Sequence, residues 1–219
     1  MNLKSLSLIP VLVLAAATPA LCQDQTVRAY VVAAGGTALN NDFERPATAV
    51  AVEYGERVHR DVQAYVAFGY VENLMSERMR GNLDLAGMEL SQSTGVPWEF
   101  HGRDRGLTFT VGGKYLLPAN RAFRPYVGGG LGVLNLKRRI TERDLGDVSG
   151  TFFDLTGRND GIIDAGATSV TRPLAEIILG AGGAAGRAYF DIAYRDRKAF
   201  HAFENIAFSQ VTAGVGVAF

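Results

Sequence analysis

The sequence predicts an all-β protein, an eight-stranded antiparallel up-and-down transmembrane β-barrel with long extracellular loops. Three observations predict it. Apolar residues recur at every second position in eight segments, short and long connections alternate between these segments, and the opposite face of the segments is mainly Gly, Ala and Thr. The chain has 219 residues, 47% of them hydrophobic, which is enough for one domain and excludes a disordered chain.

Composition removes several classes of protein. Lys and Arg together number 22, as do Asp and Glu, so no excess of positive charge favours a nucleic-acid partner. A single cysteine excludes a disulfide scaffold. The 26 glycines lie largely inside apolar segments and follow no collagen period.

Residues 1–22 read as a signal peptide. They combine a positively charged start, an apolar run from Leu6 to Ala17 and small residues before a cut after Cys22. The run is too short to span a bilayer as a helix. We therefore expect an exported protein whose barrel domain comprises 23–219. Lipidation of Cys22 is the alternative, although Leu21 departs from the usual lipoprotein pattern.

Eight segments carry the period-two pattern of strands, and 107–117 shows it best. There Leu, Phe, Val and Tyr share one face, while Thr, Gly and Lys share the other. The lengths suit membrane strands of about 9–11 residues with extensions. The predicted strands are roughly 26–36, 47–56, 60–72, 105–117, 124–137, 173–183, 187–197 and 207–219.

The connections give independent support. Those after strands two, four and six are short, whereas those after strands three and five, about 73–104 and 138–172, are long. Outer-membrane barrels have short periplasmic turns and longer extracellular loops. The alternation therefore predicts that both termini face the periplasm and both long loops face outward.

The apolar face is predicted to meet lipid. A soluble β-sandwich is the alternative, but its other face would be solvated and rich in charge, whereas here it is mainly Gly, Ala and Thr. The predicted outward residues include Val50, Val52, Tyr54, Val62, Val66, Phe68, Tyr70, Leu107, Phe109, Val111, Tyr115, Leu117, Phe190, Ile192, Tyr194, Val211, Ala213, Val215, Val217 and Phe219.

Six charged residues fall on the predicted inner face, three of each sign. Unpaired charges in a narrow interior would cost several kcal/mol each, so balanced signs predict a network of salt bridges that fills the barrel. The alternative is that some of them lie at the wet ends of the barrel. The predicted interior charges are Arg28, Glu53, Lys114, Glu176, Asp191 and Arg195.

The fifth strand departs from the pattern. Its outward residues are predicted to be Val127, Leu131 and Val133, but Leu134 and Leu136 break the alternation. We therefore expect a bulge or a change of register at this point.

At this stage the sequence resembles the small OmpA-like and opacity-type outer-membrane β-barrel family. The resemblance rests on the Arg-Pro-Tyr-Val-Gly-Gly-Gly-Leu-Gly-Val stretch of 124–133, on Asp-Ile-Ala-Tyr-Arg at 191–195 and on the alternating ending at 213–219. It implies the eight-stranded fold and implies that the terminal Phe219 is an assembly signal read by the barrel-assembly machinery.

Small barrels of this kind include lipid-modifying enzymes and proteases, so catalysis needs its own examination. The histidines are His59, His101 and His201, and they lack the spacing of a zinc site. We predict no catalytic residue, no cofactor and no metal site. The one enzymatic alternative combines His201 with Glu204 and Ser209, because a lipid hydrolase needs a base, an acid and a nucleophile near the membrane rim.

The sequence thus predicts a non-enzymatic protein of the cell outer membrane with a structural or adhesive role. Its expected partners are outer-membrane lipid and lipopolysaccharide, the barrel-assembly machinery, and an extracellular ligand at 73–104 and 138–172, but no nucleic acid. Three alternatives stay open: a narrow porin-like channel, a lipid-modifying enzyme, and a soluble periplasmic barrel of lipocalin type.

Overall fold

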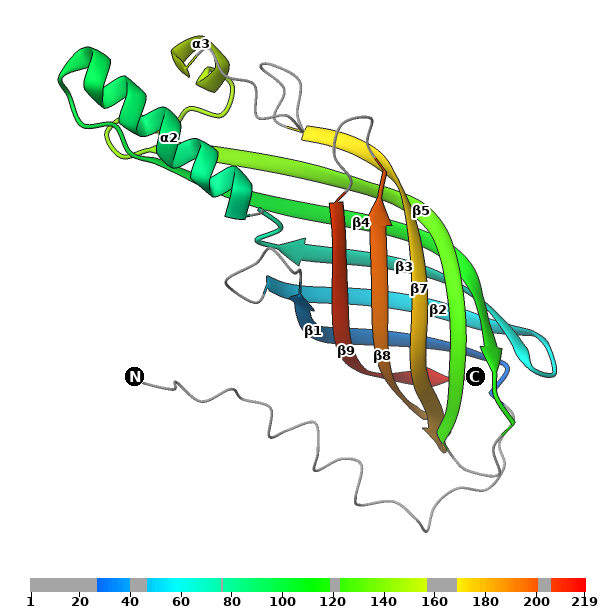
Figure 1. Ribbon diagram of the computed structural model, residues 1–219. Coiled ribbons are helices and arrows are strands. Elements are labelled where there is room, and N and C mark those ends of the chain that lie inside the picture. Colours follow the sequence, from blue (N-terminus) through cyan, green and yellow to red (C-terminus); the bar gives the residue numbers. More distant parts are fainter. Residues whose placement is uncertain (1–26, 40–46, 76, 119–122, 157–168, 201–205) are drawn as a thin grey trace, which may run out of the picture.

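The computed structural model describes the chain except for residues 1–26, 40–46, 76, 119–122, 157–168 and 201–205. The predicted signal peptide, 1–22, lies outside the described residues. Figure 1 shows a sheet that curves round on itself and a long helix beyond one end of it. Neither of the two helices found in the described residues is long and apolar enough to cross a membrane. The elements are β1 Ala29–Leu39, β2 Ala47–His59, β3 Val62–Glu72, α2 Glu77–Thr94, β4 Phe100–Leu116, β5 Phe123–Glu142, β6 Gly146–Asp147, α3 Phe152–Thr156, β7 Ser169–Ala185, β8 Ala188–Ala199 and β9 Ile206–Ala218.

Eight long strands form a closed antiparallel barrel. The sheet runs β4-β3-β2-β1-β9-β8-β7-β5, and pairing of β4 with β5 closes it. The first and last barrel strands are neighbours, with Val31 opposite Val217. Closure pairs the backbone groups of every strand, which is the condition for crossing a membrane with strands. The predicted fold class is confirmed, and each of the eight predicted segments corresponds to one barrel strand.

The alternation of side chains follows the prediction. On the outside, Val50, Phe68 and Leu131 expose 49%, 61% and 72% of their surface. On the inside the burial pattern alternates accordingly, most regularly along β4 and β8. Apolar side chains therefore cover the outside of the barrel, and many of the charged and small residues of the strands point inward.

Interior glycines make room for four interior tyrosines. A Cβ atom on Gly55 would lie 2.3 Å from the ring of Tyr30, and one on Gly130 would lie 2.3 Å from the Tyr65 hydroxyl. The same holds for Gly180 beside Tyr126 and Gly182 beside Tyr189. These four glycines thus have a packing cause, because each leaves the space that an opposing aromatic ring occupies.

The expectation of a bulge in the fifth strand was wrong. β5 pairs with β4 and with β7 in unbroken register, and Leu134 and Leu136 point inward with no exposed surface. They belong to an apolar layer inside the barrel, so the inner face is not polar along its whole length. The register irregularity that the structure does contain lies between Arg57 and His59, where β2 pairs with β3.

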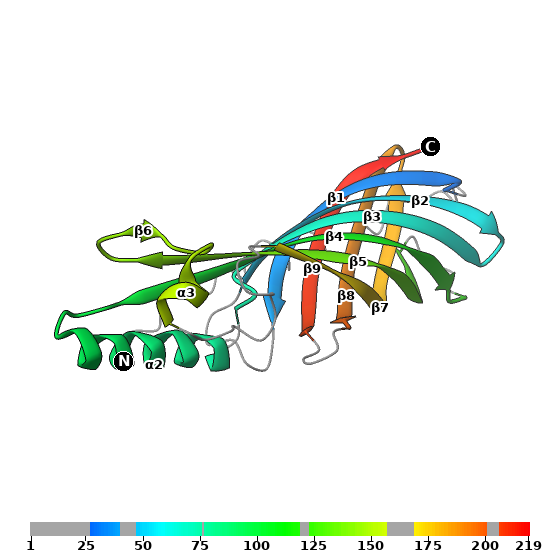
Figure 2. The same cartoon turned by 90° about the horizontal axis from the view of Figure 1, so that it is seen from above.

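The two ends of the barrel differ. The short-turn end carries the β2–β3, β4–β5 and β7–β8 connections and the C-terminus, and the long-loop end carries the two helices (Figure 1). At the long-loop end β4 and β5 continue past the other strands. β3 pairs with β4 only as far as Arg105, and β7 pairs with β5 only as far as Lys137, whereas β4 begins at Phe100 and β5 ends at Glu142. We call the assembly of 100–104, 138–142, α2, β6 and α3 the arm; Figure 2 shows it projecting to one side of the barrel.

Candidate functional site

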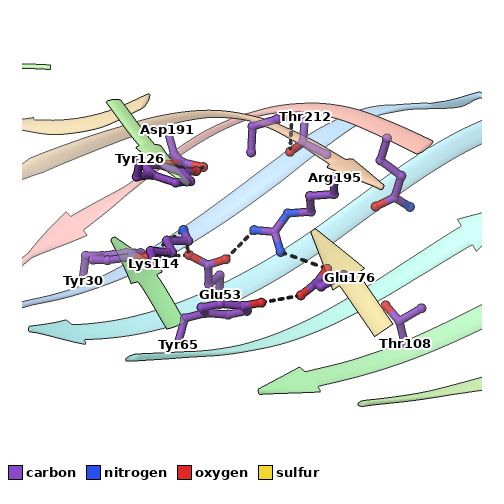
Figure 3. Close-up of polar contacts among 12 residues, drawn as sticks. Tyr30, Glu53, Tyr65, Thr108, Lys114, Tyr126, Glu176, Asp191, Arg195 and Thr212 are labelled. Atoms are coloured by element: carbon purple, nitrogen blue, oxygen red, sulfur yellow. Dashed lines mark hydrogen bonds and ion pairs between the residues drawn. The ribbon is translucent and has the colours of Figure 1, made fainter. Parts of the chain in front are cut away.

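The barrel interior holds six buried charged groups in its central part, three acids and three bases. They come from β2, β4, β7 and β8, and therefore from opposite walls of the barrel. Figure 3 shows most of them converging on one another rather than pointing to either end. The six residues are Glu53, Glu176, Asp191, Lys114, Arg195 and Arg197.

Glu53 is the centre of one half of this network. Its Oε1 accepts hydrogen bonds from Lys114 Nζ at 2.5 Å and from the Tyr30 hydroxyl at 2.6 Å. Its Oε2 accepts a hydrogen bond from the Arg195 guanidinium. The Lys114 ammonium also lies 4.4 Å from the centre of the Tyr126 ring, a cation–π distance.

Glu176 is the centre of the other half. Its Oε1 accepts a hydrogen bond from the Tyr65 hydroxyl at 2.7 Å, and its Oε2 accepts one from Arg197 Nε at 2.8 Å. Arg195 Nη1 lies 3.6 Å from the same Oε2, so Arg195 bridges the two halves. Such charge-assisted hydrogen bonds are stronger than neutral ones and hold their partners in fixed geometry.

Apolar layers close the network at both ends. Toward the long-loop end a cluster from most of the barrel strands includes Val71, Leu134, Leu136, Leu174 and Phe208. Toward the short-turn end the rings of Tyr30 and Tyr189 stack with centroids 4.1 Å apart. The described interior is therefore filled by side chains, as is usual for eight strands.

The arm has a hydrophobic core of its own. Met75, Leu83 and Ala86 from the α2 region pack on Phe100 and Ile140, which lie on the inner face of the β4–β5 extension. Phe152 of α3 adds an edge-to-face contact with Phe100, at 5.1 Å between ring centres. The separate core explains why this part of the long loop folds into helix and sheet.

The junction between arm and barrel is a buried ion pair. Arg138 Nε and Nη2 donate to the two carboxylate oxygens of Asp104 at 2.8 and 2.6 Å. Both side chains are 2% exposed. This bidentate pair joins β4 to β5 at the level where the other strands of the barrel end.

An open groove of about 420 Å³ follows one side of α2. Trp98 and Phe100 stack along it, and the Trp98 indole nitrogen donates to Thr94 Oγ1 at 3.0 Å. Its lining mixes apolar, amide and acidic groups, a surface suited to binding rather than to acid–base chemistry. The lining includes Asp84, Met88, Gln92, Trp98, Glu99 and Phe100.

The turn between β5 and β6 is fixed by Glu142. Its Oε2 accepts hydrogen bonds from the backbone N–H groups of Leu145 and Asp144, each at 2.7 Å. These hydrogen bonds, that of Leu145 most strongly, hold the pKa of Glu142 below its ordinary value because they favour the charged form. Asp147 is similar, since the hydroxyl of Ser149 lowers its pKa.

Comparison with known proteins gives fold similarity without sequence similarity. No family model matches the chain, and no curated protein matches it. Among solved structures, a major outer membrane protein from Thermus thermophilus is 8% identical with a TM-score of 0.50, over 87% of this chain and 99% of that one. The fold is that of a small outer-membrane β-barrel.

Two further structures resemble the chain more loosely. Ail, the attachment invasion locus protein of Yersinia pestis, is 11% identical with a TM-score of 0.49, over 88% of this chain and 99% of that one. The outer membrane enzyme PagL is 14% identical with a TM-score of 0.42, over 87% of this chain and 99% of that one. Identities this low describe the fold and nothing of the activity.

The structure places the predicted interior charges as follows. Glu53, Lys114, Glu176, Asp191 and Arg195 are each at most 4% exposed inside the barrel. Asp191 is held by the Tyr126 hydroxyl, which lies 2.8 and 3.0 Å from its two oxygens.

The prediction that Arg28 lies inside the barrel was wrong. It has the inward parity, but it precedes β1 and its side chain is exposed at the short-turn end. A charge there stays hydrated and needs no partner. Phe219, the predicted assembly signal, follows β9 at the same end and is 69% exposed.

Sequence reasoning missed Arg197 and the tyrosines. Arg197 is 1% exposed and shares the inward parity of Arg195, so applying the period-two pattern to the last residue of the predicted strand 187–197 would have found it. The interior tyrosines carry the same signal, because Tyr65 has the parity opposite to the outward Val66, whereas Tyr54 shares the parity of the outward Val52. Parity would therefore have placed Tyr65 inside, but its hydrogen-bond partner Glu176 follows only from the closed barrel.

The predicted catalytic alternative is only partly described. His201 and Glu204 lie outside the described residues. Ser209 Oγ lies 2.9 Å from Asp196 Oδ1 and accepts a hydrogen bond from the Tyr194 hydroxyl, all on the outer face. His101 is exposed and lies 3.3 Å from Glu99. Among the described residues no three His, Cys, Asp or Glu side chains are grouped so as to hold a metal ion.

Proposed function

We propose that this chain is a non-enzymatic outer-membrane protein whose filled barrel holds the arm at the cell surface, where the arm makes adhesive contacts. The observation that carries the proposal is the arm's separate core. β4 and β5 extend past the barrel, and their inner face packs on Leu83 and Ala86 of α2. A protein that only had to span the membrane gains nothing from an ordered structure there.

The proposed location rests on the barrel's exterior. Apolar side chains cover the outside from Leu107 on β4 to Leu117 directly after it, which is about 33 Å along the chain. A strand tilt of about 40° reduces this length to about 25 Å, the height of the apolar band in outer-membrane barrels. We place the long-loop end outside the cell and propose Phe219 as the signal for assembly.

The filled interior supports a structural role for the barrel. Glu53 and Glu176 are bound to cations and hydroxyls of the same interior, so these acids serve to hold opposite walls together. The groove beside α2, lined by the partly buried Trp98 and the exposed Met88, is the surface we propose for contact.

The test uses the protein displayed in outer membranes. Fractionation followed by gel electrophoresis of unboiled and boiled samples establishes a closed barrel if the band shifts on boiling. Adhesion of the displaying cells to a matrix-coated surface is then compared between the wild type and a Met88→Glu Trp98→Ala variant. We expect the variant to keep the heat-dependent shift and to lose adhesion. Equal adhesion by vector-only cells overturns the proposal, as does altered lipid A acylation on expression.

A narrow channel is the second candidate, and two interior atoms favour it. Gln63 Oε1 and Thr110 Oγ1 are buried without a hydrogen-bond partner among the described residues. Buried polar atoms of this kind are usually satisfied by water, which the interior would then admit. Planar-bilayer recordings decide between the candidates: stable unitary conductance changed by Thr110→Val supports the channel, and silent membranes support the filled barrel.

A further inference from the structure

The outer face of the β4–β5 pair carries four basic residues in register. Arg103 lies opposite Arg139, and Arg105 lies opposite Lys137. All four side chains are exposed, on the face of the strands opposite to the one that packs on α2. We call these four residues the basic array.

Like charges directly opposite each other on neighbouring strands destabilise a sheet. Two acidic groups offset part of the repulsion: Asp147 lies 2.9 Å from Arg139, and Glu72 lies 3.9 Å from Arg105. Arg103 and Lys137 have no acidic partner in the part of the chain that the structure describes. The array therefore keeps two uncompensated positive charges that an anion would stabilise.

The array continues directly into the apolar band. Along β4 the outward residue after Arg105 is Leu107, which is 58% exposed, followed by Phe109. Along β5 the outward residue after Lys137 is Asn135, opposite Leu107, and it is followed by Val133 and Leu131, which are 41% and 72% exposed. One strip of the surface thus changes from cationic to apolar where the hydrocarbon region is expected to begin.

We propose that the basic array binds the phosphate groups of a membrane lipid whose acyl chains lie against Leu107, Phe109 and Val133. Guanidinium groups bind phosphate in a bidentate manner, and three of the four residues are arginines. A soluble anion would use the cations alone, whereas an amphiphilic lipid uses both halves of the strip. The inference rests on the proposed outer-membrane location, and it assigns a phosphorylated lipid of the outer leaflet, a class of partner already expected from the sequence, to these four basic residues.

The test measures lipid binding by the purified full-length barrel in detergent micelles. The probes are diphosphoryl lipid A, the same lipid without phosphates, and phosphatidylcholine. The variant carries Arg103→Gln, Arg105→Gln, Lys137→Gln and Arg139→Gln. The matched control replaces exposed arginines of the short-turn end, as Arg28→Gln, Arg60→Gln and Arg187→Gln.

We expect the wild type and the control to bind the diphosphoryl lipid at least about tenfold more tightly than the variant binds it. The temperature of unfolding gives an independent measurement. In lipid-free micelles the variant is expected to unfold at the same temperature as the wild type or higher, because repulsion is removed. With the phosphorylated lipid present, the order is expected to reverse.

Three results overturn the inference. They are equal binding by variant and wild type, equal binding of lipid with and without phosphate, and full competition by inorganic phosphate or a soluble polysulfate, which would identify a site for soluble anions. A protein absent from the outer membrane, or without a heat-dependent shift, refutes the proposed function instead. The micelle measurement separates the two failures because it requires only the folded barrel.

Discussion

Lys114 on β4 and Glu53 on β2 form an ion pair in the middle of the barrel, with Nζ 2.5 Å from Oε1 and neither side chain more than 2% exposed. β2 and β4 are not hydrogen-bonded neighbours, because β3 lies between them. Arg195 reaches the same carboxylate from β8 on another wall. The pair therefore connects two strands that share no backbone hydrogen bonds. The backbone hydrogen bonds hold neighbouring strands together around the wall, whereas the interior network holds strands together across the barrel.

Replacing Lys114 with Met is expected to destabilise the folded barrel by about 3 to 5 kcal/mol, because Glu53 is left buried with one cation fewer. Urea unfolding in detergent micelles, monitored by the gel shift on boiling, measures the change in the free energy of unfolding. Lys198→Met is the matched control, since that lysine is exposed on β8. A loss of the same size in both variants would show that the interior pair contributes nothing specific.

Gly55→Ala is expected to cost about 1 to 3 kcal/mol by overpacking, because its Cβ would lie within 2.3–2.4 Å of three atoms of Tyr30. The same unfolding measurement applies. Gly35→Ala is the control, since a Cβ there meets nothing within 4 Å. The packing explanation of the glycines fails if the two alanine variants unfold at the same urea concentration.

The barrel was predictable because the alternation of apolar and small residues that specifies it can be read within single segments of the sequence. Period-two alternation, as in 107–117, determines which face is apolar, and the alternation of short and long connections indicates which end of the barrel carries the long loops. The interior was predictable only as far as parity reaches. Glu53 and Arg195 are inside for that reason, whereas Arg28 shares the parity but lies beyond the strand.

The remaining features depend on positions far apart in the sequence. Leu134 and Leu136 broke the local pattern because the interior changes from polar to apolar along the barrel, which only the assembled cluster with Leu174 and Phe208 reveals. The arm was read as a loop. α2 begins at Glu77 in a polar segment, and its apolar partners Phe100 and Ile140 lie on strand extensions outside the predicted bounds.

Leu83→Ala is expected to loosen the arm and leave the barrel closed. Leu83 is 1% exposed in the arm core, and truncating a buried leucine costs about 2 to 5 kcal/mol. Limited proteolysis should cut the variant within 77–99 faster than the wild type, with an unchanged gel shift. Leu85→Ala, at a residue 46% exposed on the same helix, is the control. Loss of the gel shift in Leu83→Ala would mean that arm and barrel fold as one unit.

Acid is expected to loosen the β5–β6 turn through Glu142. The backbone amides of Leu145 and Asp144 hold the pKa of this carboxyl below its ordinary value of about 4.3. A lowered folded pKa gives stability that is fully present above about pH 4.3 and is lost as the pH falls through the folded pKa. The side-chain carboxyl carbon shift of Glu142, followed by NMR from pH 7 to pH 2, should report a midpoint below 4.3, and the amide shift of Leu145 should show a component with the same midpoint. Glu142→Gln should abolish that titration while the lowered pKa of Asp147 persists, because Ser149 holds the latter independently. A midpoint at or above 4.3 for the wild type would show that the carboxylate does not hold the turn.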